Sequence, residues 1–299
     1  MASFKIEKIL IPIDFSETAM KAVEHAAFIA NTFKAELILL HVVEKQWEHF
    51  NIIQPELTVP QPSGIIPLVE KKLAEIASDI FTKYGVKSIT ISSTGNIFSE
   101  IIAVSEEHHV DLIVMGTHGT KGVVEFFIGS NTYKIVTKSK CPVLSIQKNA
   151  DKVGFKNILL PIDNSLHSRQ KVNYVIILAK AFGATIHIAG ITDSNKDSDM
   201  KKFELKIKQV EDYIKKDDIK YTSNIVVDSN PLRVTNIYAK TVNADLIVIM
   251  TDQDEKITGN LLGGYAQQIV NKSIIPVMSI EPELGEISYP SLAGGYHGA

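Results

Sequence analysis

The stretch Ile9-Leu10-Ile11-Pro12-Ile13-Asp14 decides the fold of this chain, because it occurs twice. It returns 149 residues later as Ile158-Leu159-Leu160-Pro161-Ile162-Asp163. A later pair of segments repeats as well, since Asp111-Leu112-Ile113-Val114 matches Asp245-Leu246-Ile247-Val248. A repeat of this length indicates a duplicated domain, because the units of solenoid proteins are much shorter.

The two copies differ by one long insertion. The later pair of segments is 134 residues apart rather than 149, so the first copy carries 15 more residues between its second strand and its second helix. These residues fall within Gln46–Pro67, which holds four prolines and is predicted to be a loop. We therefore divide the chain into domain 1 (1–148), domain 2 (155–282) and a C-terminal tail (283–299).

Each copy has the pattern of an α/β domain. Short β-branched runs alternate with helical periodicity, which is typical of βαβ units and a parallel sheet. The runs are almost entirely apolar, which indicates strands buried on both faces. We expect two Rossmann-like domains, each with a five-stranded parallel sheet and helices on both faces. The expected strands are 8–14, 35–43, 88–93, 112–116 and 142–146, then 157–163, 185–191, 221–227, 246–250 and 277–280. The expected helices include 16–31, 68–84, 97–108, 132–138 and 199–216.

The composition argues against several classes of partner. A net charge of −3 gives no basic surface for nucleic acid. No apolar run is long enough to span a membrane, and the first residues lack the apolar core of a signal peptide. The single cysteine, Cys141, excludes an internal disulfide and suits a reducing compartment. We expect a cytoplasmic protein.

Spaced glycines follow the apolar run Leu112–Met115 in the first copy, as Gly116, Gly119 and Gly129 with Ser130 after the last. A strand that ends in such a turn and then enters a helix exposes backbone N–H groups that can surround phosphate oxygens. Glycine is also the default residue of tight turns, so these three can be structural with nothing bound. Their position and spacing favour a nucleotide phosphate site.

Three polar side chains near this turn have two interpretations each. Asp14 can assist the start of the first helix or accept hydrogen bonds from adenine or ribose. Ser130 and Thr132 can cap a helix, contact phosphate through the same N–H groups, or both. His118 has no nearby partner that would mark a catalytic triad or a metal site, so we expect it to pack beside the ligand.

Together these motifs resemble the universal stress protein family in its tandem form. The resemblance covers nearly all of the first copy and is weaker in the site of the second. It is carried by Pro12-Ile13-Asp14, His41-Val42, Met115-Gly116-Thr117-His118-Gly119, Gly129-Ser130 and Cys141-Pro142-Val143.

The resemblance implies a fold of the adenine nucleotide α-hydrolase type, with ATP or AMP (or ADP) bound at the carboxyl ends of the strands. It places Asp14 near the adenosine, Val42 against the adenine, and the glycine turns around ribose and phosphates. It also implies pairing through the fifth strands, so that a tandem chain is an intramolecular pseudo-dimer; a homodimer of whole chains stays open. The expected nucleotide-binding residues are Pro12, Ile13, Asp14, Val42, Met115, Gly116, His118, Gly119, Gly129, Ser130, Asn131 and Thr132.

The second copy has lost this pattern. Met250 and Gln253 stand at the positions of Gly116 and Gly119, and Gly263-Gly264 replaces Gly129-Ser130. Side chains at the first two positions obstruct a close approach of phosphate to the backbone. Acidic residues at 252, 254 and 255 add repulsion, on the order of 1 kcal/mol for each carboxylate about 4 Å from a phosphate oxygen. We predict that only domain 1 binds a nucleotide.

The function expected from these features is that of a nucleotide-binding stress-response or regulatory protein. One alternative is a slow ATPase or a self-phosphorylating enzyme with Ser130 or Thr132 as acceptor, although no Gly-x4-Gly-Lys-Ser/Thr loop is present. Another alternative is a scaffold without nucleotide. Mg²⁺ can accompany ATP by bridging its phosphates, but no carboxylate cluster in the first copy marks a metal site built by the protein.

Overall fold

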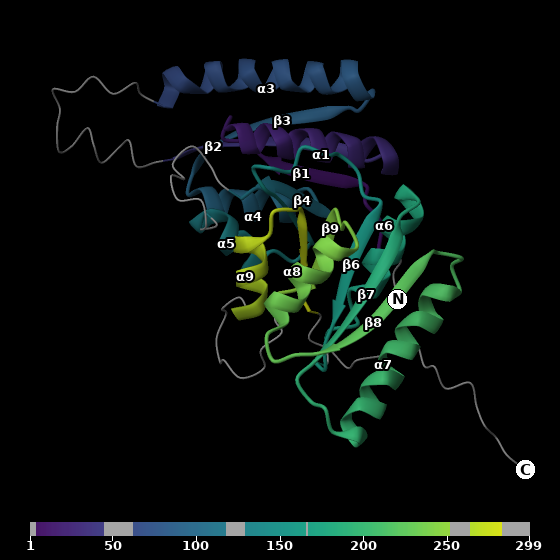
Figure 1. The fold of residues 1–299 in the computed structure, drawn as a ribbon. Coiled ribbons are helices and arrows are strands. Elements are labelled where there is room, and N and C mark those ends of the chain that lie inside the picture. The colour runs from purple at the N-terminus through teal and green to yellow at the C-terminus, as the bar shows by residue number, and fades with distance from the viewer. Residues whose placement is uncertain (1–3, 45–61, 118–128, 166, 252–263, 283–299) are drawn as a thin grey trace, which may run out of the picture.

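The computed structural model describes residues 4–44, 62–117, 129–165, 167–251 and 264–282. The ten strands of these residues form one sheet in the order β3-β2-β1-β4-β5-β10-β9-β6-β7-β8 (Figure 1). Within each half all neighbouring strands are parallel. The expected fold class is therefore confirmed in both copies. The strands are β1 (Lys8–Pro12), β2 (Glu36–Glu44), β3 (Ser88–Gly95), β4 (Leu112–Gly116), β5 (Val143–Ile146), β6 (Asn157–Ile162), β7 (Thr185–Thr192), β8 (Tyr221–Val227), β9 (Leu246–Met250) and β10 (Val277–Ile280).

Helices cover both faces of the sheet. Apolar side chains of α1, α3, α6 and α7 pack on one face, and those of α4, α5, α8 and α9 pack on the other. None of these helices is both long and apolar enough to cross a membrane. Their bounds are α1 (Glu17–Phe33), α3 (Pro62–Tyr84), α4 (Ile97–Glu107), α5 (Ser130–Lys138), α6 (Val172–Phe182), α7 (Asp197–Lys215), α8 (Pro231–Thr241) and α9 (Gly264–Lys272).

The prediction of a loop over Gln46–Pro67 is wrong at its end, because α3 begins at Pro62 and contains Pro67. Proline at the first helical position costs little, since its missing N–H would have no helical partner there. Pro67 forfeits one internal hydrogen bond. The helix continues because Val69 and Leu73 behind it are buried against the sheet. The rest of that predicted loop, and the predicted tail 283–299, lie outside the described residues.

Equivalent aspartates of the two copies hold the start of the first strand in each half. Asp111 accepts hydrogen bonds from the N–H groups of Glu7 and Lys8 at 2.8 and 2.9 Å. Asp245 accepts from Lys156 and Asn157 at 2.9 and 3.0 Å. This duty explains why the aspartate that opens the repeated fourth-strand motif is present in both copies, since unpaired N–H groups there would be costly.

The two halves meet where β5 and β10 pair as antiparallel strands. Leu144 lies opposite Met278, and the flanking pairs are Ser145 with Val277 and Val143 with Ser279. Leu144 and Met278 are equivalent positions of the two copies, so the register has the symmetry of an isologous contact. This is the fifth-strand pairing that the resemblance implies, formed within one chain.

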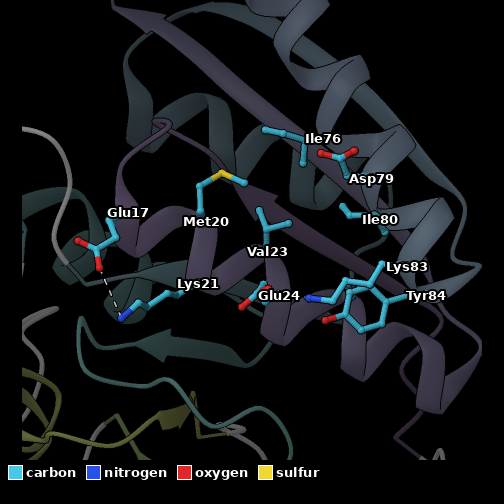
Figure 2. A pocket seen from close by; sticks show the side chains of 11 residues that line it. Glu17, Met20, Lys21, Val23, Glu24, Ile76, Asp79, Ile80, Lys83 and Tyr84 are labelled. Atoms are coloured by element: carbon cyan, nitrogen blue, oxygen red, sulfur yellow. Dashed lines mark hydrogen bonds and ion pairs between the residues drawn. The ribbon is translucent and has the colours of Figure 1, made fainter.

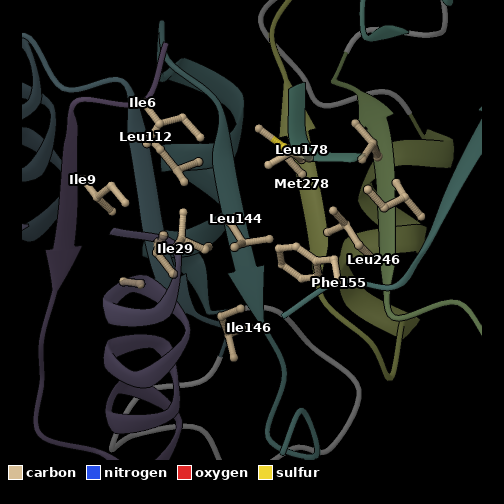
Figure 3. Close-up of a cluster of buried hydrophobic side chains, with 14 of the residues drawn as sticks. Ile6, Ile9, Ile29, Leu112, Leu144, Ile146, Phe155, Leu178, Leu246 and Met278 are labelled. Atoms are coloured by element: carbon tan, nitrogen blue, oxygen red, sulfur yellow. The ribbon is translucent and has the colours of Figure 1, made fainter. Parts of the chain in front are cut away.

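The apolar core runs across this junction without a break. Figure 3 shows Leu144, Phe155, Leu246 and Met278 in one cluster with side chains from both halves. Ile29 of α1 belongs to the same cluster. The halves therefore share buried surface in addition to strand hydrogen bonds.

Side chains on one face of α1 bind the segment that links the two halves. Lys21 forms an ion pair of 2.6 Å with Asp151. One helical turn further, His25 donates a hydrogen bond from Nε2 to the carbonyl oxygen of Ala150 at 3.1 Å. Because the imidazole is 1% exposed, burial lowers the pKa of His25, although the bond to Ala150 and the charge of Glu24 oppose this.

The pKa of His25 makes the folded protein sensitive to acid. A histidine whose pKa falls on folding stabilises the protein above its ordinary pKa of about 6.5, and this contribution is lost as the pH falls. We expect His25→Gln to lose less unfolding free energy than wild type between about pH 7.5 and pH 5.5, measured by urea unfolding. His109→Asn, a change at an exposed histidine, is the control. Equal acid sensitivity of wild type and His25→Gln would contradict this account.

Candidate functional site

The carboxyl ends of β1, β2 and β4 meet at one edge of domain 1. β1 lies between β2 and β4, and the connections from these strands leave in opposite directions. Such a switch point is where open α/β sheets bind ligands. The structure brings together most of the expected site residues here, namely Pro12, Ile13 and Asp14 after β1, Val42 on β2, Met115 and Gly116 on β4, and Gly129, Ser130, Asn131 and Thr132 at α5. His118 and Gly119 lie outside the described residues.

Asp14 organises the start of α1. Its Oδ1 atom accepts a hydrogen bond from the N–H of Ser16 at 3.0 Å, and the Ser16 hydroxyl in turn accepts from the N–H of Ala19 at 3.2 Å. Both residues are half-buried. The structural interpretation of Asp14 therefore has direct support, and the carboxylate also lies at the strand edge where a ligand role would place it.

Two aromatic residues beside Asp14 were not assigned to the site from the sequence. The His41 ring donates from Nδ1 to the carbonyl oxygen of Ile13 at 2.6 Å, which fixes the proton on that nitrogen. Phe15 stacks on His41 with ring centroids 4.8 Å apart, and Nζ of Lys72 lies over the Phe15 ring, 5.1 Å from its centroid. Phe15 has φ of 61°, a conformation that is uncommon for a bulky residue. Only the position of His41 at the end of an apolar strand could have indicated its role.

The amino end of α5 presents backbone donors without a side-chain cap. Its N-cap is Gly129, and among the described residues no side-chain cap hydrogen bond is formed there. Thr132 is buried and donates from Oγ1 to the carbonyl oxygen of Gly116 at 3.2 Å. The N–H of Gly129 donates to the carbonyl oxygen of Thr117 at 2.9 Å. These two bonds hold the helix end beside β4, so its N–H groups and positive dipole face the strand edge.

Packing within the protein gives a reason for glycine at position 116. A Cβ atom there would lie 2.9 Å from Cγ2 of Thr18 and 3.2 Å from the backbone nitrogen of Ala19. The absent side chain therefore makes room for the first turn of α1. At Gly129 the nearest atom of the described residues would be 3.4 Å away, an ordinary contact, so packing against these residues does not demand glycine at that position.

Domain 2 is built differently at the same edge. Met250, in place of Gly116, is fully buried. Asp163 accepts from the N–H and the hydroxyl of Ser165 at 2.9 and 2.6 Å. Lys171 occupies the position of Ala22 and is also fully buried, with Nζ 3.4 Å from Oγ of Ser168. Burial lowers the pKa of Lys171 to about 8, while the charge of Asp163 raises it.

The aromatic pair of domain 1 has no counterpart in domain 2. Gly190 stands at the position of His41, and a Cβ atom there would lie 3.0 Å from the side chain of Ile207 on α7. Asn164 replaces Phe15 and donates to the hydroxyl of Thr192 at 3.2 Å. Helix α7 therefore approaches the space that the imidazole takes in domain 1.

A groove of about 320 Å³ lies between α1 and α3 (Figure 2). Its floor is apolar, with Met20, Val23 and Ile80, and charged side chains such as Glu24 and Lys83 stand at its rim. Glu24 and Lys83 pair with each other at 2.8 Å. Across the described part of the chain, no three His, Cys, Asp or Glu side chains are grouped so that they could hold a metal ion.

The fold and this strand edge define a doubly wound α/β protein with a duplicated domain, and comparison with known proteins gives its family. The model of the universal stress protein family matches residues 5–147 and 154–280. The chain belongs to the universal stress protein family.

Individual relatives match about half of the chain. Universal stress protein MJ0577 of Methanocaldococcus jannaschii is 33% identical over 161 residues, which cover 49% of this chain and 98% of the relative. Universal stress protein MJ0531 of the same organism is 32% identical over 149 residues, covering 48% and 82%. A crystal structure of a universal stress protein from Archaeoglobus fulgidus shares the fold over 93% of this chain and 97% of its own, with a TM-score of 0.71 and 21% identity.

The buried charge of Lys171 should lower the unfolding free energy of the protein relative to an apolar residue at that position. An apolar side chain of similar length avoids the cost of burying an ammonium group, so Lys171→Met should raise the unfolding free energy by roughly 1–4 kcal/mol near pH 7. In the folded protein the amine is charged below about pH 8. The gain should therefore shrink as the pH rises toward about 10.5, the ordinary pKa of lysine.

Urea unfolding of the full chain at several pH values measures this effect. Lys202→Met, at an exposed lysine of α7, is the control and should change little. A Lys171→Met chain that is clearly less stable than wild type at pH 7 would show that the buried amine is a net stabilising partner of Asp163.

Proposed function

We propose that this protein binds one adenine nucleotide, ATP, ADP or AMP, in domain 1 and acts as a regulatory protein of the stress response. The observation that carries the proposal is the uncapped amino end of α5 beside the end of β4. Backbone N–H groups at such a helix end suit phosphate oxygens, because they are donors in a positive field and, within the described part of the chain, no side chain caps them.

The adenosine end of the ligand has a matching surface. Val42 is half-buried at the end of β2 and offers an apolar contact for the base. Asp14 offers carboxylate oxygens, which can accept hydrogen bonds from ribose hydroxyls or the adenine amino group. His41 holds the carbonyl group of Ile13 and thereby the turn that carries Asp14.

Glycine at position 129 also supports a ligand. The described residues leave room for a side chain there, since the nearest of their atoms to a Cβ would be 3.4 Å away. The close approach of a phosphate to the N-cap would instead explain why no side chain is present. With this support, the site residues in domain 1 remain those expected from the sequence, with His41 as a residue that positions them.

Domain 2 is proposed to bind no adenine nucleotide. Its strand edge is internally bonded, because the carboxylate of Asp163 accepts from Ser165, and Lys206 donates to the carbonyl oxygen of Asp163 at 3.2 Å. The position of Thr132 holds Ala266, which cannot form the bond that places the helix end in domain 1. We further propose that domain 2 serves as the permanent pairing partner of domain 1, so that one chain works as a fused dimer.

The stoichiometry and the role of Asp14 are tested together by titration calorimetry of the full chain with ATP and with AMP. We expect one equivalent per chain. Asp14→Asn should weaken binding by about tenfold, or about 1.4 kcal/mol, as one charge-assisted hydrogen bond is lost. Asp163→Asn, the same change in domain 2, should leave the affinity unchanged. Two equivalents per chain, or loss of binding only in Asp163→Asn, would overturn the assignment to domain 1.

The role of the α5 end is tested at Gly129. Alanine fits the protein at this position, so Gly129→Ala should keep the melting temperature within a few degrees of wild type. Its methyl group would occupy space at the phosphate, so nucleotide affinity should fall by about tenfold or more, at least 1.4 kcal/mol. A variant that binds ATP as well as wild type would place the phosphates elsewhere.

Catalysis is examined by incubating the protein with ATP and Mg²⁺ and following ADP release and protein mass. The phosphates would supply the principal ligands of such a Mg²⁺ ion, because the described residues provide no acidic cluster. A binding protein should release less than one equivalent of ADP and gain no mass. Turnover beyond one equivalent, abolished by Gly129→Ala, would identify an ATPase instead.

A further inference from the structure

The first helix begins at different places in the two domains. α1 starts at Glu17, three residues after Asp14, with Ser16 as its N-cap. α6 starts at Val172, which aligns with Val23, so it begins six residues later in the repeat. Between Ser165 and α6 the chain makes turns, including hydrogen bonds from the N–H of Gln170 to His167 and from that of Val172 to Arg169.

The sequence of the cap does not explain this difference. Domain 2 retains Ser165 at the position of Ser16, and its N–H is bonded to the preceding aspartate as in domain 1. In domain 1 the serine hydroxyl accepts from the N–H of Ala19 and starts the helix. In domain 2 the Ser165 hydroxyl instead donates to Asp163 at 2.6 Å, and the N-cap of α6 is Lys171, with no side-chain cap. The cap residue is present but starts no helix.

The residue at the end of the fourth strand accounts for the difference sterically. A Cβ atom at Gly116 would lie 2.9 Å from Cγ2 of Thr18, which is too close without a shift, and in tight contact at 3.2 Å with the backbone nitrogen of Ala19, both in the first turn of α1. Met250 has such a side chain, is fully buried, and belongs to the core on the face that α6 covers. A helical turn placed as in α1 cannot occupy the same volume, because buried regions are close-packed.

Lys171 completes the altered arrangement. At its position domain 1 has Ala22, fully buried under α1. A lysine cannot be placed there with its ammonium group in apolar surroundings, whereas the turn of domain 2 brings Nζ within 3.4 Å of the Ser168 hydroxyl. In domain 2 the helix therefore starts one turn and more later, beside the buried Met250, and the turn before it places the ammonium group of Lys171 near Ser168.

We propose that the last residue of the fourth strand, Gly116 or Met250, determines where the first helix of its domain begins, and that Met250 with Lys171 thereby prevents the aspartate and serine of domain 2 from taking the arrangement found in domain 1. These are positioning residues, since they act through the helix start. Their connection to ligand binding rests on the proposed function, but their effect on the helix does not.

Hydrogen exchange of the full chain, followed by mass spectrometry, tests the helix start without any nucleotide. The variant Met250→Gly with Lys171→Ala places the domain 1 residues in domain 2. The amide of residue 171 should exchange at least about tenfold more slowly than in wild type, because it enters the hydrogen bonds of a helix that starts earlier, whereas the amides of 170 and 172 already donate within the turn. Met250→Leu with Lys171→Ala keeps a large buried side chain and should leave exchange at residue 171 fast. Equal exchange in the two double variants would overturn the proposal.

The reverse change is made in domain 1. Gly116→Ala should speed exchange at residues 20–23 and weaken nucleotide binding by about tenfold, or about 1.4 kcal/mol. Adding Thr18→Ser removes the Cγ2 atom that the new Cβ would meet, so it should restore part of both losses, which a general loss of stability would not show. Absence of any rescue, with slow exchange kept in α5, would contradict the proposed contact. If wild type binds no nucleotide, the exchange results alone still decide where the helix begins.

Discussion

The antiparallel pairing of β5 with β10 is the contact on which the rest of the structure depends. Two five-stranded sheets become one because Leu144 and Met278 face each other at equivalent positions of the repeat. β5 and β10 are each four residues long and fully buried. Apolar side chains of both strands belong to a cluster that contains residues of both domains. The fifth strand of each domain therefore has no open edge. Unpaired backbone groups along such an edge would be both costly and prone to aggregation.

Much of the fold could be predicted from the sequence because each element leaves a local pattern. The central parallel strands are mostly apolar and buried. Four of the ten described strands begin and end where the pattern predicts, namely Leu112–Gly116, Tyr221–Val227, Leu246–Met250 and Val277–Ile280. The prediction of a loop up to Pro67 is wrong because proline acts as a helix breaker only through local backbone effects. In this helix the burial of Val69 and Leu73 outweighs that local cost.

The site could be predicted only in part, since its decisive features are contacts between distant residues. The glycines were recognised, but the reason for Gly116 lies in its contact with Thr18 on another element. Phe15 and His41 are 26 positions apart and meet only because β1 and β2 are neighbours. The late start of α6 could not be predicted from the nearby sequence. Ser165 is a suitable N-cap residue, and the reason that no helix starts there lies in the distant Met250.

The connection between the halves also changes what substitution can do to the protein. In a dimer of identical chains, every replacement appears on both sides of the dyad, so a methionine at the end of the fourth strand would alter both first helices at once. Here Lys21 and His25 bind a covalent linker, and the two partners can never separate or exchange. A replacement can therefore change the strand edge of one side alone while the junction of β5 and β10 stays intact, and asymmetry becomes a heritable property of a single polypeptide.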